Sequence, residues 1–552
     1  MYSEHAGLLM ERFPRLGLLA GTWEALEPVY EVLGEVALQG VELLYVYGIG
    51  DGRVYEQLSA WLHEEKKRQL VFLEDEPGYL AFLLEQEGTK KLLSDEQVFI
   101  ELFSSGRLRA KELTAIAEKF PIRKVEVLAL PSRSTRRFRS LRLTLLRKTT
   151  LAHGIHLDRL HGYQPFQNFV QNLKHLPRSF YANGMKGTFP KVPAIVCGAG
   201  PSLQAAIPLL RKYQDQLLIM GGGSTLAALS SQGIIPHFGM AIDPNIEEYL
   251  RFQNSFAFET PLLYSTRVFP QIFQTCNGPF GYMRTGIGGM MELWIEEVLG
   301  LKERLLGDHL TGETMSVTAI CLAWAQFLGA DPIFLSGVDL AYTDQKRYSP
   351  GVAEEVPFAQ LQTEKGASDH LYKRKDRLGR PVYTAVRWVM ESNCLSHFAK
   401  KHPKTTFINT SEGGIGFKHI PYQPLEEVLA RYCTQKLDLE QRVHEKIFAS
   451  PMPAHAAETI HSKMEELKQS LDRIIGHLEI LAKDTSEGRR ALAELDLLEE
   501  MAYPYLFYDA QKLFGDKEEK WELFYNQARR YRLMFEKGPA FAAKAANNPK
   551  EE

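Results

Sequence analysis

The feature that most constrains the fold is a repeated pattern of short apolar runs that end in glycines or polar residues and lead into helical stretches. In the first part of the chain the runs are ELLYVYGIGDG (42–52), KRQLVFLEDEP (67–77) and RKVEVLALP (123–131). Apolar runs of this length, separated by helical patterns, are typical of parallel strands joined by crossover helices. Residues 1–145 are therefore predicted to form an α/β domain.

The same alternation returns in residues 150–430. VPAIVCGAGPSL (192–203) and DQLLIMGGGSTLAAL (215–229) each run from a strand through glycines into a helix. Four further strands end in polar residues: HFGMAIDPN (237–245), TPLLYSTR (260–267), DPIFLSGVDLAY (331–342) and TTFINTSEGG (405–414). Open α/β sheets bind ligands at this end of their strands. We predict a second Rossmann-like domain with its binding site there.

Residues 455–552 have a helical pattern instead. Apolar side chains alternate at spacings of four and three, which defines a heptad seam: Ile460, Met464, Leu467, Leu471, Ile474, Leu478 and Leu481. Such a seam packs either within one chain, which we favour, or across a homo-oligomer. The predicted fold class is thus α/β, with two Rossmann-like parallel-sheet domains followed by a helical C-terminal domain.

Composition excludes several classes of protein. The net charge of −3 argues against broad binding of nucleic acid. The five cysteines contain no CxxC pair, so neither a zinc site nor a disulfide framework is expected. No apolar run reaches the roughly 20 residues that a membrane span needs, and the N-terminus lacks the apolar core of a secretory signal. A cytoplasmic location is expected.

A basic segment, residues 133–148, follows the first domain. It is interpreted as a solvated helix face beside a linker, with a surface for an acidic partner as the alternative. Glu74, Asp75 and Glu76 end a strand of the first domain and are interpreted as a solvated strand end.

The sharpest local motif is Gly198-Ala199-Gly200-Pro201-Ser202. Gly198 and Gly200 permit positive φ and close backbone approach, while Pro201 and Ser202 suit the start of a helix. Unpaired amides and the helix dipole at such a start favour a phosphate. The motif is neither a Walker A loop nor a full GxGxxG, so tight packing of a turn is the alternative.

Three other strand ends or helix starts carry candidate ligands. Gly222, Gly223 and Ser224 let a nucleotide lie against bare backbone, or else form a compact helix start. Asp243 is predicted to contact a ribose or sugar hydroxyl rather than a metal ion. An apolar helix is predicted to begin at the segment of Gly312, Thr314 and Ser316, and the start of a helix favours a bound anion.

Asp339, in the run GVDLAY, ends a strand in the same region. It is predicted to orient a substrate hydroxyl or to accept a proton, with a buried helix-capping aspartate as the alternative.

Together these motifs resemble the central domain of the motility accessory factor (Maf) family. The resemblance rests on CGAGPSL, GGGSTLAAL with GIIPHFGMAIDP, and SVTAICLAWAQFLGADPIFLSGVDLAYT. The stretch DRLGRPVYTAVRWVMESN followed by FINTSEGGIGF fits the same pattern. The resemblance is strong over residues 190–420. The central domain of the Maf family is in turn similar to bacterial sialyltransferases and to the 6-hydroxymethylpterin diphosphokinase MptE.

The resemblance implies a cytoplasmic glycosyltransferase. It would move a nonulosonic acid of the pseudaminic or legionaminic type from a CMP-sugar to serine or threonine of a protein such as flagellin. Gly198, Gly200, Pro201 and Ser202 would hold the donor phosphate. Gly222, Gly223 and Ser224 would lie along the nucleotide, and Asp243 would contact ribose or sugar. Gly312, Thr314 and Ser316 would meet the donor near its phosphate and carboxylate, and Asp339 and Tyr342 would face the sugar.

Two positions depart from the family pattern. His237 stands where the family usually has aspartate, and Tyr348 stands near an expected histidine. His370 is a candidate substitute base, because a histidine titrates near neutral pH; a solvated loop histidine is the alternative.

The implied reaction needs a stabilised leaving phosphate and a base for the acceptor hydroxyl. It requires no metal or cofactor. A cation is expected for the donor carboxylate, and four candidates remain unranked: Arg267, Arg284, Arg347 and Arg380. Two alternatives stay open: a pterin diphosphokinase that uses ATP and Mg²⁺, and a nucleotide-fold protein that chaperones an export substrate without catalysis.

Overall fold

The computed structural model describes residues 2–104, 106, 108–160, 163–310, 316–352, 366–514 and 520–536. Two compact units make up the chain. The first comprises Met1–Leu157, Val356–Tyr372 and Thr384–Met390, and the second Asp158–Glu355, Lys373–Tyr383 and Glu391–Glu552. The chain thus forms two units where three domains were predicted, since the C-terminal helices lie in the second unit.

The sheet of the first unit is parallel throughout. In the described residues it has four strands: β1 (Leu43–Tyr47), β2 (Gln69–Glu74), β3 (Val98–Leu102) and β4 (Val125–Ala129). Their order is β3-β2-β1-β4, so consecutive strands run outward from β1 to β3, and β4 then returns to the other side of β1. All five residues of β1 are buried, as expected of a strand covered on both faces.

Helices pack on this sheet over two separate apolar clusters. Helix α3 buries Val54, Tyr55, Leu58 and Leu62, the i, i+4 and i, i+7 positions of one helical face. The helices are α1 (Tyr2–Arg12), α2 (Pro14–Ala20), α3 (Arg53–Glu64), α4 (Pro77–Leu83), α5 (Thr89–Ser94), α6 (Arg109–Lys119) and α7 (Arg136–Leu160).

The basic segment forms the start of α7 and the residues before it. Two of its arginines pair with carboxylates of the first unit: Arg137 with Asp75 at 2.6 Å, and Arg142 with Glu126 at 3.0 Å. The segment therefore belongs to the first unit, and part of its charge is neutralised there.

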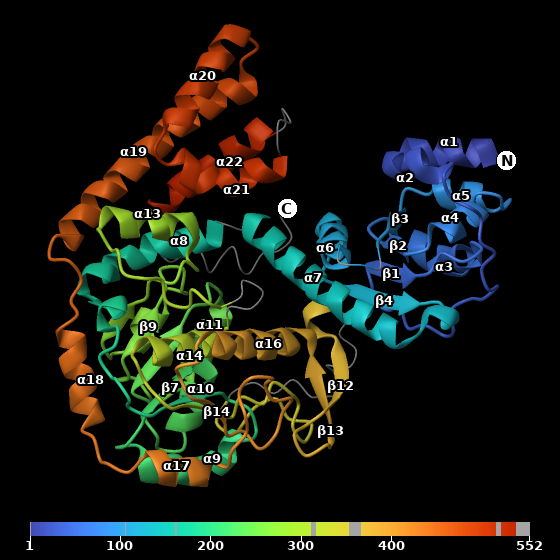
Figure 1. The fold of residues 1–552 in the computed structure, drawn as a ribbon. Coiled ribbons are helices and arrows are strands. Elements are labelled where there is room, and N and C mark those ends of the chain that lie inside the picture. Colours follow the sequence, from blue (N-terminus) through green and yellow to red (C-terminus); the bar gives the residue numbers. More distant parts are fainter. Residues whose placement is uncertain are drawn as a thin grey trace. The chain divides into compact units, whose positions relative to one another are not determined.

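The second unit contains a larger parallel sheet (Figure 1). Within the described residues its strand order is β14-β11-β6-β7-β8-β9-β10-β5. The bounds are β5 (Phe180–Tyr181), β6 (Ala194–Cys197), β7 (Leu218–Gly222), β8 (Phe238–Ala241), β9 (Leu262–Tyr264), β10 (Phe280–Tyr282), β11 (Ile333–Ser336) and β14 (Phe407–Asn409). Strands β6 to β10 run outward in one direction, and β11 pairs with β6 on its other side. The order therefore reverses between β6 and β11.

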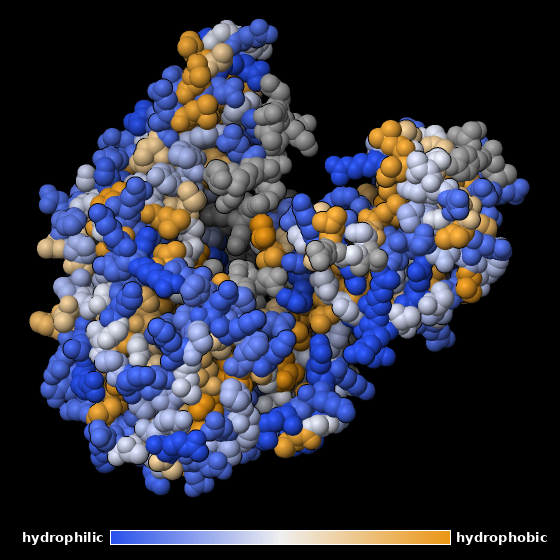
Figure 2. Space-filling view, in the orientation of Figure 1, coloured by the Kyte–Doolittle hydropathy of each residue, from blue (hydrophilic) through white to orange (hydrophobic). Residues whose placement is uncertain are grey.

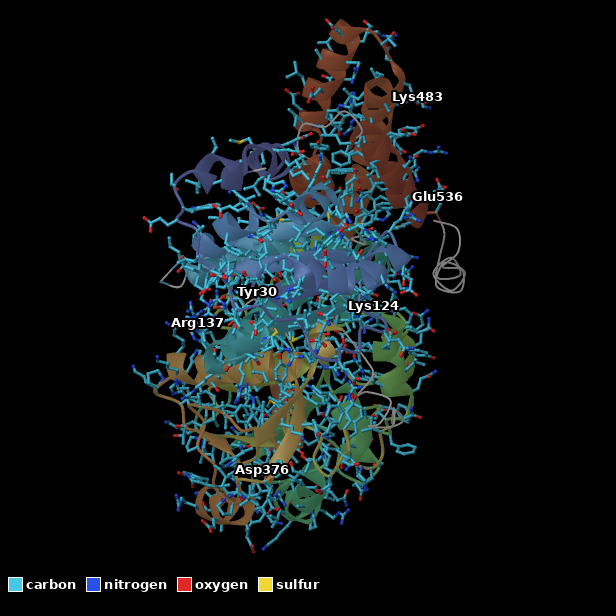
Figure 3. All side chains as sticks on the ribbon, turned by 90° about the vertical axis from the view of Figure 1, so that its right-hand side faces the viewer. Tyr30, Lys124, Arg137, Asp376, Lys483 and Glu536 are labelled. Carbon is cyan, nitrogen blue, oxygen red and sulfur yellow. The ribbon has the colours of Figure 1, made fainter. Side chains whose placement is uncertain are left out.

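Helix α14 (Val317–Phe327) lies at the heart of this unit. Its Trp324 is fully buried and meets Phe238 of β8 edge-on, with ring centroids 5.6 Å apart. The other helices are α8 (Tyr163–Asn172), α9 (Leu203–Tyr213), α10 (Gly223–Ser230), α11 (Ile246–Gln253), α12 (Ile272–Thr275), α13 (Gly289–Val298), α17 (Leu425–Tyr432), α18 (Leu439–Phe448) and α16 (Val386–Lys401), whose first residues belong to the first unit. Strands β12 (Leu371–Lys375) and β13 (Pro381–Ala385) pair as a hairpin whose turn holds Asp376 (Figure 3).

The C-terminal helices are α19 (Ala456–Lys483), α20 (Glu487–Glu499), α21 (Tyr503–Phe514) and α22 (Lys520–Met534). The heptad seam of α19 is buried within the chain, except for the partly buried Met464. These helices share one apolar cluster with the central region; the rings of Phe166 and Tyr531, for example, lie 4.6 Å apart. This shared core explains why they do not form a unit of their own.

Helix α20 has one apolar face that the chain does not cover. Leu492, Leu495 and Leu498 are exposed there, and Figure 2 shows hydrophobic side chains on this helix. Of the helices in the described ranges, none combines the length and the apolarity that a membrane crossing demands.

The predicted fold class is confirmed: the four-stranded and eight-stranded sheets are parallel and Rossmann-like, and the C-terminal region is helical.

Candidate functional site

The turn after β6 packs directly against the loop after β11. The amide of Gly198 donates to the carbonyl of Ser336 and that of Gly200 to the carbonyl of Gly337, both at 2.8 Å. A Cβ atom at Gly200 would lie 2.8 Å from Cγ of Asp339, and one at Gly198 2.5 Å from the Gly337 oxygen. Glycine is required here because the two loops approach too closely for any side chain.

Asp339 links the two loops. Its Oδ2 accepts hydrogen bonds from the Ser202 amide and the Thr343 hydroxyl, both at 3.0 Å, and its Oδ1 accepts one from the Ser202 hydroxyl. The side chain is buried, and burial raises the pKa of Asp339 although the Ser202 and Thr343 donors oppose this shift. Asp339 therefore holds the Gly198–Ser202 turn against the end of β11.

The turn does not present the free amides that the sequence suggested. The amides of Gly198, Gly200 and Ser202 all donate within the protein, so that prediction is wrong for these three residues. Among the described residues, the Ala199 amide has no acceptor. The stretch from Ala199 to Ser202, Pro201 included, is half-buried rather than covered.

A third loop, after β14, closes on the same aspartate. Gly414 has a φ of 86°, and a Cβ atom there would collide with the carbonyl of Asp339. The Ile415 amide donates to that carbonyl at 3.0 Å. The ends of the adjacent strands β14, β11 and β6 thus meet at one point, where the strand order of the sheet reverses.

The segment after Thr343 passes over the glycine turn. The Ser349 amide donates to the Ala199 carbonyl at 2.8 Å. Asp344 and Gln345 have φ values of 51° and 61°, and Leu340 one of 50°. Such left-handed conformations are uncommon outside glycine and concentrate at functional sites.

Arg347 lies in this segment. Within the described residues its guanidinium forms no ion pair, and its buried Nε has no acceptor. Its Cζ lies 4.8 Å from the ring centre of Tyr348.

The other candidate arginines are engaged elsewhere. Arg284 pairs with Glu296 at 2.9 Å and Arg380 with Asp376 at 2.7 Å. Arg267 donates to the Ile287 carbonyl at 3.0 Å. Of the four arginines that the sequence left unranked, Arg347 lies in the segment that crosses the glycine turn, and its guanidinium forms no ion pair within the described residues.

The glycines after β7 serve close packing. A Cβ atom at Gly222 would overlap the side chain of Val317, and one at Gly223 would lie 2.7 Å from the ring of Phe252. Ser224, in the first turn of α10, is half-buried. Other side chains therefore cover the backbone of Gly222 and Gly223. A nucleotide contact at Gly222, Gly223 and Ser224 stays a prediction.

A charged group lies at the end of β8. Asp243, whose side chain is 45% exposed, pairs with Arg251 at 3.0 Å, and Arg251 also pairs with Glu248 at 3.1 Å. Burial, together with the charge of Asp243, raises the pKa of Glu248 to about 7. The sequence analysis missed Glu248 and Arg251. Their signal was the i, i+3 spacing of opposite charges in the helix that follows Asp243.

Ser316 is the N-cap of α14. Its hydroxyl accepts from the Ala319 amide at 3.1 Å and donates to Glu391 at 2.6 Å. The predicted anion contacts at Gly312 and Thr314 lie outside the described residues.

Tyr342 and His370 are both buried. The Tyr342 amide donates to the Tyr383 carbonyl at 2.8 Å. His370 lies in the first unit, with Nε2 2.6 Å from the Val125 carbonyl. The interpretation of His370 as an exposed loop histidine is wrong, because the segment before β12 packs into the core of the first unit.

The departure at His237 lies away from the glycine turn. His237 comes just before β8, at the amino-terminal ends of the strands, whereas the glycine turn lies at their carboxyl ends. Its Nδ1 accepts from the Ile219 amide at 2.9 Å. Burial lowers the pKa of His237 to about 4, so the ring is neutral near pH 7. The residue lines a cavity of about 970 Å³ together with, among others, Asp215, Pro236, Thr260, Lys436 and His444.

No three His, Cys, Asp or Glu side chains form a metal-binding cluster in the part of the chain that the structure describes.

Comparison with known proteins gives two matches. A family model described as "6-hydroxymethylpterin diphosphokinase MptE-like" matches residues 167–345, roughly a third of the chain. This confirms the predicted similarity of the central region to that family. The solved structure of a Maf glycosyltransferase from Magnetospirillum magneticum AMB-1 is similar over 97% of this chain and 95% of that chain, with 15% identity and a TM-score of 0.45. A search of curated proteins finds no match.

Proposed function

We propose that this protein is a glycosyltransferase that uses a nucleotide-activated sugar. The observation that carries the proposal is the meeting of the Gly198–Ser202 turn and Asp339 where the strand order reverses between β6 and β11, with Arg347 in the segment that crosses the turn at Ser349. Open α/β sheets bind their ligands at such a reversal, outside the carboxyl ends of the strands. The resemblance of residues 190–420 to the Maf family supports the same reaction class.

The proposed donor is a CMP-linked nonulosonic acid, and the proposed acceptor is a serine or threonine of a flagellin-like protein in the cytoplasm. Donor phosphate would accept from the Ala199 amide and lie near Arg347, which stabilises negative charge as the sugar–phosphate bond breaks. Arginine also pairs with a carboxylate through two parallel hydrogen bonds, so Arg347 suits the donor carboxylate as well.

Asp339 acts in this proposal as a positioning residue. Both of its oxygens accept from Ser202, and one also accepts from Thr343, so it fixes the turn to which the phosphate binds. The carboxylate of Asp243, whose side chain is 45% exposed, is the proposed contact for a ribose or sugar hydroxyl, since it lies at the end of β8 and pairs with Arg251.

A second candidate function is a diphosphokinase that acts on a pterin. The match of residues 167–345 to the MptE-like family favours it. This reaction would need ATP and Mg²⁺, which the transferase does not need. Isothermal titration with CMP, and separately with ATP, Mg²⁺ and 6-hydroxymethyl-dihydropterin, distinguishes the two. We expect CMP to bind and the pterin not to bind.

The test of the transferase is a kinetic comparison of two matched pairs of variants. The assay follows CMP release from a CMP-nonulosonate in the presence of a flagellin acceptor. Arg347→Gln is paired with Lys346→Gln, which removes the same charge from the neighbouring exposed residue. Asp339→Asn is paired with Asp331→Asn, which changes an aspartate next to the opposite end of β11.

We expect Arg347→Gln to raise the donor KM about 10- to 100-fold, the value of one or two charge-assisted hydrogen bonds. Lys346→Gln should change it less than about threefold. Asp339→Asn should lower kcat/KM while Asp331→Asn leaves it near the wild-type value. Equal changes in the kinetic constants of the two variants of either pair would contradict the placement of the site at the reversal point. No transfer by the wild-type protein, with CMP still bound, would favour the noncatalytic binding protein.

A further inference from the structure

The first unit has its own reversal of strand order, between β1 and β4. The turn after β1 contains Gly48, Gly50 and Gly52, with φ values of 102°, 59° and 93°. These left-handed conformations favour glycine. The turn leads directly into α3, so a glycine turn and a helix start lie at the carboxyl edge of this sheet, as they do in the second unit.

A cavity of about 200 Å³ lies at this reversal point. Its walls include Gly48, Gly50, Glu74, Tyr79, Leu130 and Arg133, and Pro28, Val29 and Glu31 of the coil before β1 contribute to its lining. Sites for drug-sized ligands span roughly 300–1,000 Å³. The cavity is therefore too small for a dinucleotide and suits a nucleoside.

Glu74 is the last residue of β2 and is 1% exposed. Its interpretation as part of a solvated strand end is wrong, because it points into the unit. Oε1 accepts from the amides of Asp75 and Glu76 and from Arg133. Among the described residues, Oε2 accepts one hydrogen bond, from the Ile49 amide at 3.2 Å. A carboxylate oxygen has two lone pairs, so Oε2 can accept another donor.

Arg133 is held in one orientation beside Glu74. Its guanidinium lies 2.9 Å from Glu74 and 4.8 Å from the ring centre of Tyr79. It also contacts the ring of Tyr47. Because Arg133 pairs with a carboxylate and contacts two aromatic rings, it is a fixed wall of the cavity rather than a free phosphate ligand.

Acidic groups slightly outnumber basic ones around the cavity. Asp51 pairs with Arg53, and Asp75 pairs with Arg137, which is labelled in Figure 3. Glu74 pairs with Arg133, while Glu31 accepts from the Ser132 amide at 3.0 Å and from its hydroxyl. The guanidinium of Arg53 lies over the ring of Tyr30. This balance disfavours a di- or triphosphate and favours an uncharged ligand with hydroxyl donors.

We propose that the crevice between β1 and β4 binds a ribonucleoside group through its 2′,3′-diol, with Glu74 as the acceptor. In dinucleotide-binding sheets, an acidic residue about 20 positions after the glycine turn accepts from a ribose hydroxyl. Glu74 occupies that position relative to Gly52 and lies on the strand next to β1. The apolar surfaces of Leu130 and Val29 would face the base.

The test compares ribonucleosides with and without the diol, by isothermal titration of the full chain. The probes are adenosine, cytidine, 2′,3′-dideoxyadenosine and 2′,3′-dideoxycytidine. We expect one ribonucleoside to bind at least tenfold more tightly than a dideoxy counterpart of the same base, because a hydrogen bond to a charged group contributes about 1.5–3 kcal/mol. Equal affinities for the two forms, or no binding of either ribonucleoside, would overturn the proposal.

Two variants locate the binding site. Glu74→Gln should lower the affinity for the ribonucleoside to that of the dideoxy form, whereas Glu101→Gln, which changes a carboxylate on the neighbouring strand β3 that pairs with Lys119, should leave it unchanged. Equal affinities of the wild-type protein and Glu74→Gln would contradict the assignment. If Glu74→Gln lowers the melting temperature, photolabelling of wild-type protein with 8-azidoadenosine replaces it. Labelled peptides from residues 42–79 and 123–133 would support the proposal, and labels confined to residues 190–350 would refute it.

The nucleoside site and the transferase site can fail separately. Transfer that is lost in Arg347→Gln, without nucleoside binding in the first unit, would leave the proposed function intact.

Discussion

The two reversal points use the same parts in different arrangements. Each has a glycine turn after the first central strand, β1 or β6, and a buried carboxylate that accepts from an amide of that turn. Glu74 accepts from Ile49, and Asp339 from Ser202. Glu74 comes from the strand beside β1, on the side away from the crevice. Asp339 comes from the loop after β11, across the crevice.

This difference changes how the loops pack at the two reversal points. A carboxylate that comes from across the crevice joins the two loops, and Gly198 and Gly200 donate directly to the β11 loop. In the first unit the carboxylate comes from the same side as β1, and a cavity lies at the reversal point.

The largest effect is expected at Gly414, whose loop packs on Asp339 in the second unit. Gly414→Ala puts a Cβ atom into the Asp339 carbonyl and also strains a φ of 86°. We expect the free energy of unfolding to fall by more than about 3 kcal/mol, because the left-handed conformation alone costs about 1–3 kcal/mol. Urea unfolding followed by circular dichroism measures this change.

Gly416→Ala is the matched control. Gly416 has a φ of 67°, and nothing lies within 4 Å of a Cβ atom placed there. Its substitution should show the cost of the backbone conformation without the collision. If both variants lost the same stability, the Gly414 loop would not be packed on Asp339.

The second prediction concerns the donors to the two buried carboxylates. Glu74 of the first unit has a charged partner, Arg133, whereas Asp339 of the second unit accepts from the uncharged groups of Ser202 and Thr343. Arg133→Ala leaves the buried Glu74 without its cation, and breaking such a pair costs about 3 kcal/mol. Arg137→Ala, whose side chain is 45% exposed, should cost less than about 1 kcal/mol. Hydrogen exchange should show faster opening of β1 and β2 in Arg133→Ala, and unchanged exchange there would argue against the cluster.

The third prediction concerns pH. The pKa of Glu248 is raised from 4.5 to about 7 in the folded chain, so the folded state binds more protons than the unfolded state between these values. Stability should therefore fall as pH rises from about 4.5 to 7, by no more than about 3 kcal/mol. In Glu248→Gln this part of the slope should vanish in melting temperatures measured across that range. A slope identical to wild type would place the titrating group elsewhere.

The smallest effect is expected at the start of α14. Ser316→Ala removes the side-chain cap that accepts from Ala319, at a cost of about 1 kcal/mol. Ser486 at the start of α20 has no side-chain cap bond, so Ser486→Ala should cost less than about 0.5 kcal/mol. Thermal unfolding distinguishes the two, and a larger loss for Ser486→Ala would contradict the assignment.

The sequence predicted the α/β class and the placement of the glycine turns because these depend on local patterns. An apolar run followed by glycines specifies a strand, a turn and a helix start over about a dozen residues. Period-seven leucines likewise identified α19. The burial of that seam within the central unit depends on residues such as Phe166, which lie about 300 positions away in the chain.

The site was less predictable because its contacts join distant segments. Ser202 meets Asp339 across 137 positions, and neither residue's neighbours in the sequence indicate that pairing. His370 was placed in the wrong environment because its segment returns to the first unit. Arg347 could be singled out among the four arginines only when the partners of Arg284 and Arg380 were known.

A crystal structure of the protein with CMP bound would test the proposed nucleotide site directly. We predict the nucleotide at the reversal between β6 and β11, with its phosphate within hydrogen-bond distance of the Ala199 amide and close to Arg347. CMP bound instead in the cavity beside His237, or in the crevice between β1 and β4, would contradict it.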